Sequence, residues 1–145
     1  MMYVDIGLKS YPIVEGGAPL VFNPKDPSVY GRYQAALGEI EALEKETTEK
    51  ANAVKDGDYA ASLGILMEAD RKMKAILSRI FGCGNDFDAI LRGVGLMGEA
   101  SNGKLVISNV MDFLNELLVD GAKEYAKSEV EKAKEAREQR REESV

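Results

Sequence analysis

The period of the hydrophobic pattern changes once in this chain of 145 residues, and the change constrains the fold more than any single motif. Val4, Ile6 and Leu8 alternate with polar or small residues, which is the pattern of a half-buried strand. From residue 27 onward, apolar residues recur every three or four positions, as they do in helices with one buried face. We therefore predict a mainly α fold whose β structure is confined to residues 1–22.

The predicted β element is a small antiparallel sheet. Ile13–Val14 and Leu20–Phe22 flank Gly16–Gly17, a dipeptide that can take the positive φ of a tight hairpin. Proline cannot donate a hydrogen bond to a neighbouring strand. Pro12 and Pro19 therefore predict strands that lie at an edge or begin just beyond the proline.

Two long helices should follow as an antiparallel hairpin. Asp26 is placed to cap the first helix, with Pro27 at its first position, and this helix is expected to run to about Val54. Asp56–Gly57–Asp58 should end it and cap the second, which ends at Phe81–Gly82. The predicted buried stripes are Val29, Tyr33, Leu37, Ile40 and Leu43 in the first helix, and Leu63, Leu66, Met73, Ile76, Leu77 and Ile80 in the second.

A long C-terminal helix has the strongest one-sided pattern. We expect a short helix at Phe87–Leu91 and a glycine-rich loop at Gly93–Gly103 before it. Its stripe predicts mainly a buried face, with Leu117 at the centre, but the edge of such a stripe can instead bind a partner. The stripe comprises Val106, Val110, Phe113, Leu114, Leu117, Leu118, Gly121 and Tyr125, and the candidate partner-binding residues are Val110, Phe113, Leu114, Leu117, Leu118 and Tyr125.

The end of the chain is charged and poor in apolar residues. Between Lys123 and Glu143, seven Lys or Arg balance seven Asp or Glu, so the net charge of -6 lies in the preceding part. Pairs such as Glu129 with Lys132 have the i,i+3 spacing that stabilises a helix by about 0.2–0.5 kcal/mol. We predict one mainly helical domain over residues 1–125 and a solvent-exposed tail, helical or disordered, over residues 126–145.

Composition argues against most kinds of enzyme. The chain has no histidine, the side chain most used for proton transfer near neutral pH, and its single cysteine, Cys83, lacks a histidine to activate it. We interpret Cys83 as a small residue in a tight turn. A carboxylate pair can still perform acid-base chemistry, so a small enzyme remains the third hypothesis.

Two further patterns resemble ligand sites but have simpler explanations. Gly93–Gly98 matches G-x-G-x-x-G, but no good strand precedes it and no helix follows at once, so we predict a connecting loop. The pairs Asp56/Asp58 and Asp86/Asp88 do not continue as a calcium-binding loop. We interpret both pairs as helix caps and predict no metal, cofactor or catalytic residue.

Charge and hydropathy also predict where the protein works. A net charge of -6 and a pI near 4.8 have the wrong sign for binding nucleic-acid phosphates. The N-terminus has no signal-peptide pattern, and no run approaches the 18 apolar residues of a membrane span. We expect a cytoplasmic protein that binds neither nucleic acid nor membrane.

The order of these segments resembles a known family. Phe22–Pro24 after a short β start, a long acidic helix, Ile80–Gly84, a glycine-broken loop, Phe113–Leu117 and an Arg/Glu-rich end together resemble the tail assembly chaperones of long-tailed bacteriophages, as found in prophages of Gram-positive bacteria. The resemblance covers most of the chain. It implies a non-enzymatic protein of the host cytoplasm that coats the tape measure protein, keeps it soluble and recruits tail tube subunits.

Two other non-enzymatic functions stay open beside the chaperone. One is a structural or adaptor component of a phage tail or head completion complex, and the other is a generic helical protein-interaction domain. Self-association is expected in each case, because two long helices and a tail offer more apolar edge than a small sheet can cover.

Overall fold

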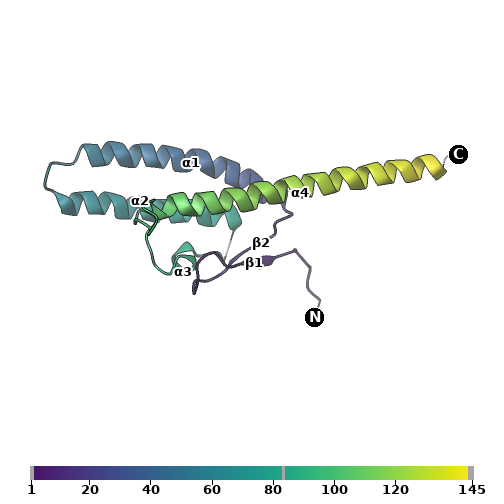
Figure 1. Cartoon of the computed structure of the whole chain (residues 1–145), viewed down its shortest axis with the longest axis horizontal. Helices are drawn as coiled ribbons and strands as arrows, with labels where there is room; N and C mark the ends of the chain where they lie inside the picture. Colours follow the sequence, from purple (N-terminus) through teal and green to yellow (C-terminus); the bar gives the residue numbers. More distant parts are fainter. Residues whose placement is uncertain (1, 83, 144–145) are drawn as a thin grey trace.

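The computed structural model describes residues 2–82 and 84–143. The elements, in chain order, are β1 (Lys9–Tyr11), β2 (Leu20–Phe22), α1 (Pro27–Asn52), α2 (Tyr59–Phe81), α3 (Phe87–Ile90) and α4 (Val106–Glu143). Helices α1 and α2 form an antiparallel hairpin, and α4 runs along this hairpin before projecting beyond it as a single helix (Figure 1). The predicted mainly α fold, with a hairpin, a long C-terminal helix and a small N-terminal antiparallel sheet, is confirmed.

The first strand lies later in the chain than the alternation at residues 4–8 predicts. Strand β1 pairs with β2 only over Lys9–Tyr11, and residues 2–8 are exposed. Just before β1, Gly7 has a φ of 70°, which interrupts the extended backbone, and it donates its N–H to the side chain of Asp5 at 2.8 Å. The predicted strand at Val4, Ile6 and Leu8 is therefore wrong.

The proline positions and the antiparallel pairing agree with prediction, but the hairpin loop is longer than a two-residue turn. Pro12 follows β1 and Pro19 precedes β2, so neither interrupts the pairing. Ile13 and Val14 belong to this loop and pack against the core instead of forming a strand. A Cβ atom at Gly17 would lie 2.3 Å from the carbonyl oxygen of Ile90, so only glycine permits this approach to α3.

The predicted caps define the helix starts. Asp26 caps α1 by accepting the backbone N–H of Ser28 at 3.0 Å, with Pro27 in the first turn. Asp58 caps α2 by accepting the N–H of Ala61 at 3.1 Å. Helix α1 ends at Asn52, two residues before the predicted end, and α2 ends at Phe81 as predicted.

Replacing Asp26 with alanine should lower the free energy of unfolding by about 1 kcal/mol at pH 7. Hydrogen bonds from the side chain and backbone of Ser28 hold the pKa of Asp26 below its ordinary value of 3.8. The charged cap therefore stabilises the fold above pH 3.8, and this contribution disappears as the pH falls through the lower folded-state pKa. Urea unfolding of both proteins at pH 7 and pH 3 should show the difference shrinking. A difference that grows on acidification would contradict this assignment.

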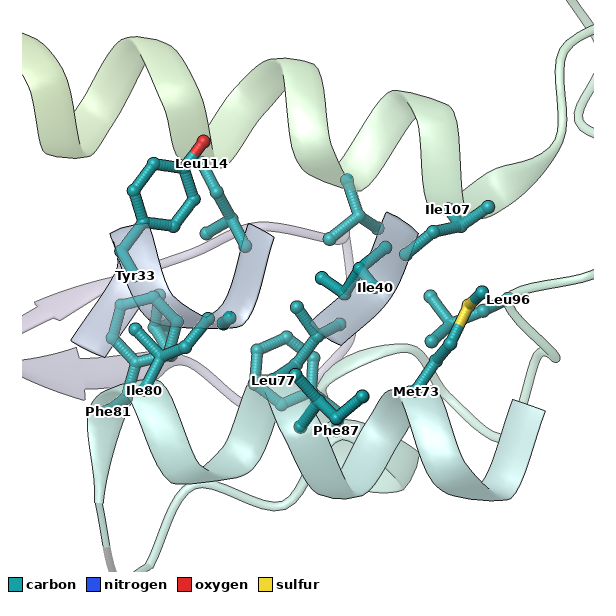
Figure 2. Close-up of a cluster of buried hydrophobic side chains, with 14 of the residues drawn as sticks. Tyr33, Ile40, Met73, Leu77, Ile80, Phe81, Phe87, Leu96, Ile107 and Leu114 are labelled. Atoms are coloured by element: carbon teal, nitrogen blue, oxygen red, sulfur yellow. The ribbon is translucent and has the colours of Figure 1, made fainter. Parts of the chain in front are cut away.

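The core lies where α1, α2 and α4 meet, with α3 and the following loop closing one side (Figure 2). Tyr33 and Ile40 enter it from α1, and Leu114 enters from α4 (Figure 2). The ring of Phe22 extends the core to the sheet, with its centroid 5.0 Å from that of Phe81. This ring contact packs the sheet against the C-terminal end of α2.

The predicted buried stripe of α2 is wrong in its first half. Leu63 is 60% exposed and Leu66 is 36% exposed, whereas the buried residues of α2 run from Ala69 to Phe81. Helix α4 begins at Val106 beside the middle of the hairpin and runs away from its tip (Figure 1). The tip therefore has no third helix to cover its apolar residues.

The C-terminal tail is helical to Glu143, and residues 126–143 are exposed. The predicted Glu129–Lys132 ion pair is present at 3.4 Å. Deleting residues 127–145 should therefore lower the unfolding temperature by only a few degrees, because the side chains of residues 127–143 are all exposed. Scanning calorimetry of the shortened chain measures this shift. An unfolded or insoluble product would mean that the tail supports the body.

Candidate partner-binding groove

An open groove of about 750 Å³ runs between the middle of α4 and the N-terminal sheet. One wall is α4, from Phe113 to Lys132. The other wall consists of β1 and the segment Pro24–Lys25 that leads from β2 toward α1. We call this feature the α4–β1 groove.

The apolar row of the groove follows directly from helix geometry. Phe113, Leu117, Gly121 and Tyr125 recur every four residues and therefore lie along one side of α4. The opposite wall lies close to α4 at Gly121, where an added Cβ atom would be in ordinary van der Waals contact, 3.5 Å from the carbonyl oxygen of Pro24. The row lies beside the buried face of α4 and is partly open to solvent.

The structure divides the predicted partner-binding residues between two faces of α4. Phe113, Leu117 and Tyr125 line the α4–β1 groove, and Phe113 remains 39% exposed. The other three residues are buried in the core: Val110, Leu114 and Leu118. Leu117 is half-buried, so its predicted place at the buried centre of the stripe is wrong, and Leu114 holds that place instead.

A buried asparagine, Asn85, which no pattern in the sequence singles out, holds the sheet wall in place. The side chain of Asn85 accepts the N–H of Val21 and donates to the carbonyl of Val21, both at 2.8 Å. It also donates to the carbonyl of Phe81 at 3.4 Å. Asn85 thus pairs with the N–H and the carbonyl of Val21 at the free edge of β2, as the backbone of a third strand would do. In the sequence Asn85 stands between Gly84 and Asp86, and neither neighbour indicates that its side chain binds β2.

The rims of the α4–β1 groove carry opposite charges. Glu116, Asp120 and Glu124 line the α4 side at four-residue spacing, whereas Lys9 and Lys25 line the sheet side. Within residues 2–82 and 84–143, none of these five side chains forms an ion pair. The rims can therefore present both signs of charge to a bound molecule.

A second, smaller groove of about 330 Å³ borders the first. It lies between α4 and the segment that leads into α1, and Pro24, Lys25 and Tyr125 belong to both grooves. Its lining is largely apolar and includes Phe22, Val29, Leu118 and Ala122. Together the two grooves extend the apolar surface around Tyr125.

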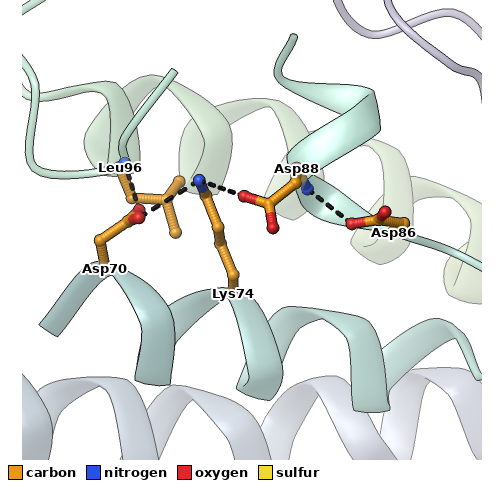
Figure 3. Close-up of polar contacts among 5 residues, drawn as sticks. All are labelled: Asp70, Lys74, Asp86, Asp88 and Leu96. Carbon is orange, nitrogen blue, oxygen red and sulfur yellow. Dashed lines mark hydrogen bonds and ion pairs between the residues drawn. The ribbon is translucent and has the colours of Figure 1, made fainter. Parts of the chain in front are cut away.

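Three of the four aspartates that resembled a metal site, Asp58, Asp86 and Asp88, have structural partners. Asp86 caps α3 by accepting the N–H of Asp88 at 2.9 Å, and Asp88 contacts Lys74 at 2.7 Å (Figure 3). Lys74 also contacts Asp70 at 3.2 Å. Burial alone would lower the pKa of Lys74, but its hydrogen bonds to Asp88 and Asp70 raise it above the ordinary value. The predicted capping roles are confirmed for Asp58 and Asp86. The predicted role is wrong for Asp88, whose side chain pairs with Lys74 instead.

The G-x-G-x-x-G segment forms part of the loop before α4, as predicted. Leu96 lies fully buried in the core, and its N–H donates to Asp70 at 2.7 Å (Figure 3). The loop thus has a carboxylate beside its backbone, where a phosphate would meet repulsion. The predicted tight turn at Cys83 lies outside the described residues.

Among the described residues, no group of three or more Asp, Glu or Cys is arranged to hold a metal ion. None of the described helices has both the length and the hydropathy that crossing a bilayer requires. No protein-family model matches the chain, and no curated protein or solved structure is detectably similar to it.

Proposed function

We propose that this protein is a non-enzymatic assembly chaperone that binds an apolar helix of its partner in the α4–β1 groove. The observation that carries the proposal is the open apolar row Phe113, Leu117, Gly121 and Tyr125, which lies beside the buried face of α4. In keeping with the resemblance to phage tail assembly chaperones, the partner is the tape measure protein, and the bound complex recruits tail tube subunits in the host cytoplasm.

The size of the groove supports a helix as the bound element. From Phe113 to Tyr125 the row spans about 18 Å at 1.5 Å per residue, or about three helical turns. A helix of that length presents anchors at i, i+3 or i+4, and i+7 on one face, which is the usual way in which an amphipathic helix occupies an apolar groove. Aromatic side chains at both ends of the row are suited to bury large contact areas.

Co-expression with the tape measure protein of the same genome tests the proposal. The full chain should keep that protein soluble and should co-purify with it. A Phe113→Ala/Leu117→Ala double variant should lose at least about tenfold in the amount recovered, because both changes remove groove contacts. Val130→Ala serves as the matched control, since Val130 is 54% exposed on the same helix and lies outside the groove lining.

Two results would contradict the proposal. One is a tape measure protein that stays insoluble in the presence of the full chain. The other is equal co-purification with the double variant and with the wild-type chain, after circular dichroism has shown equal helix content. Sedimentation velocity of the purified chain provides a separate test of the proposed self-association, for which a strict monomer at high micromolar concentration would be the contrary result.

A further inference from the structure

We propose that the α4–β1 groove selects an amphipathic helix that carries cations along one edge of its apolar stripe and anions along the other. This inference rests on the proposed function, because it defines the chemistry of the partner helix at the same site. The inference rests on the two oppositely charged rims of the groove. Each rim favours side chains of the opposite charge on the nearer edge of the bound helix.

The acidic rim favours cationic side chains on the nearer edge of the partner helix. Glu116, Asp120 and Glu124 follow one another at i,i+4 spacing, where like charges repel and weaken a helix. Asp112, one turn earlier, has Lys104 at 3.6 Å, but the three rim carboxylates have no cationic partner within the part of the chain that the structure describes. Lys or Arg side chains on a docked helix would relieve this repulsion.

The sheet rim favours anionic side chains on the other edge of the partner helix. Lys9 belongs to β1 and Lys25 to the segment after β2, so both are placed by backbone that the core and Asn85 hold. At the far end of the groove, Lys132 is already paired with Glu129. A helix with cations on both edges would therefore meet repulsion from Lys9 and Lys25.

The charge pattern also determines the direction in which the partner helix lies. A helix with its apolar stripe on the groove floor has one edge at each rim. Turning it end over end keeps the stripe on the floor but exchanges the edges. Only one of the two directions then pairs cations with Glu116, Asp120 and Glu124. Electrostatic complementarity of this kind fixes orientation and discriminates between partners.

Three synthetic helical peptides with the same apolar stripe test the inference with the full-length chain. The first has one cationic and one anionic edge, the second has two cationic edges and the third has two anionic edges. In fluorescence anisotropy at low salt, the mixed peptide should bind roughly tenfold more tightly than either of the others. This preference should shrink as salt is added, because the rim charges are exposed.

Reversing the acidic rim should change the preferred peptide. In Glu116→Lys/Asp120→Lys/Glu124→Lys both rims are basic, so the peptide with two anionic edges should become the tightest ligand. The matched control, Glu131→Lys/Glu135→Lys/Glu138→Lys, makes the same change in net charge on exposed positions of α4 outside the groove lining. The control should keep the wild-type preference, and equal circular dichroism spectra should show that all proteins are folded.

A direction measurement completes the test. A paramagnetic tag at the N-terminus of the mixed peptide should broaden the resonances at one end of the groove, near either Phe113 or Tyr125. A second peptide with its two charged edges exchanged should place the tag at the opposite end. Broadening at the same end for both peptides would overturn the inference.

Other outcomes separate this inference from the proposed function. Equal affinity of all three peptides, while the Phe113→Ala/Leu117→Ala variant still loses the tape measure protein, would overturn the charge selection alone. The expected peptide preferences without any effect on the tape measure protein would overturn the proposed function alone. A third outcome is that the rim-reversal variant loses self-association while the matched control variant keeps it. That result would identify a second copy of the chain as the occupant of the groove, and it would also contradict the inference.

Discussion

Replacing Leu114 with alanine should lower the free energy of unfolding by about 2–5 kcal/mol, the usual cost of truncating a fully buried leucine. Leu114 is 0% exposed and lies close to Tyr33 in the core between α4 and α1 (Figure 2). The cost has two parts, the lost transfer of the removed atoms from water and the cavity that remains among neighbours held by three helices. Urea unfolding followed by circular dichroism measures it.

Leu117→Ala is the matched control for this change, because it removes the same atoms one turn away on the same helix. Leu117 is half-buried at the α4–β1 groove, so part of its side chain is already in contact with water. Its truncation should cost less than half as much as that of Leu114. Equal costs would show that the groove side of α4 is packed as tightly as the core, which would remove the basis for partner binding there.

Replacing Asn85 with alanine should destabilise the fold by about 2–4 kcal/mol. Asn85 is 7% exposed, and its amide pairs with both the N–H and the carbonyl of Val21. Alanine would leave these backbone groups of the half-buried Val21 without partners, and unpaired groups of this kind cost more than an average hydrogen bond contributes. Urea unfolding should show the loss, together with faster amide exchange at Val21.

A second variant and an exposed control sharpen the test at Asn85. Asn85→Asp keeps an acceptor for the N–H of Val21 but at neutral pH sets a carboxylate against its carbonyl oxygen, so it should destabilise the fold at least as much as alanine does. Asn102→Ala removes an exposed amide that contacts Asn109 at 2.9 Å and should cost less than about 1 kcal/mol. An Asn85→Ala protein as stable as the wild type would show that β2 does not depend on this side chain.

The helices of this protein are determined locally, and the sequence alone predicts them well. Asp26 with Pro27 and Asp58 place the helix starts, because an N-cap acts on the backbone within the next two or three residues. The periodicity of apolar positions identifies the three long helices for the same local reason. The same local reasoning fails for the strand predicted at residues 4–8, since the positive φ of Gly7 interrupts the extended backbone that the alternating pattern would need.

The extent to which each apolar stripe is covered is decided only by the tertiary structure. Leu63 has the right spacing for a core position but lies at the hairpin tip, where α4 does not reach. Leu114 and Leu117 have nearly equivalent places in the pattern, yet one lies in the core and the other in the groove. Periodicity identifies the side of a helix that is apolar, but burial also requires a neighbouring element at that height, and the position of that neighbour depends on contacts between residues far apart in the chain, such as that of Asn85 with Val21.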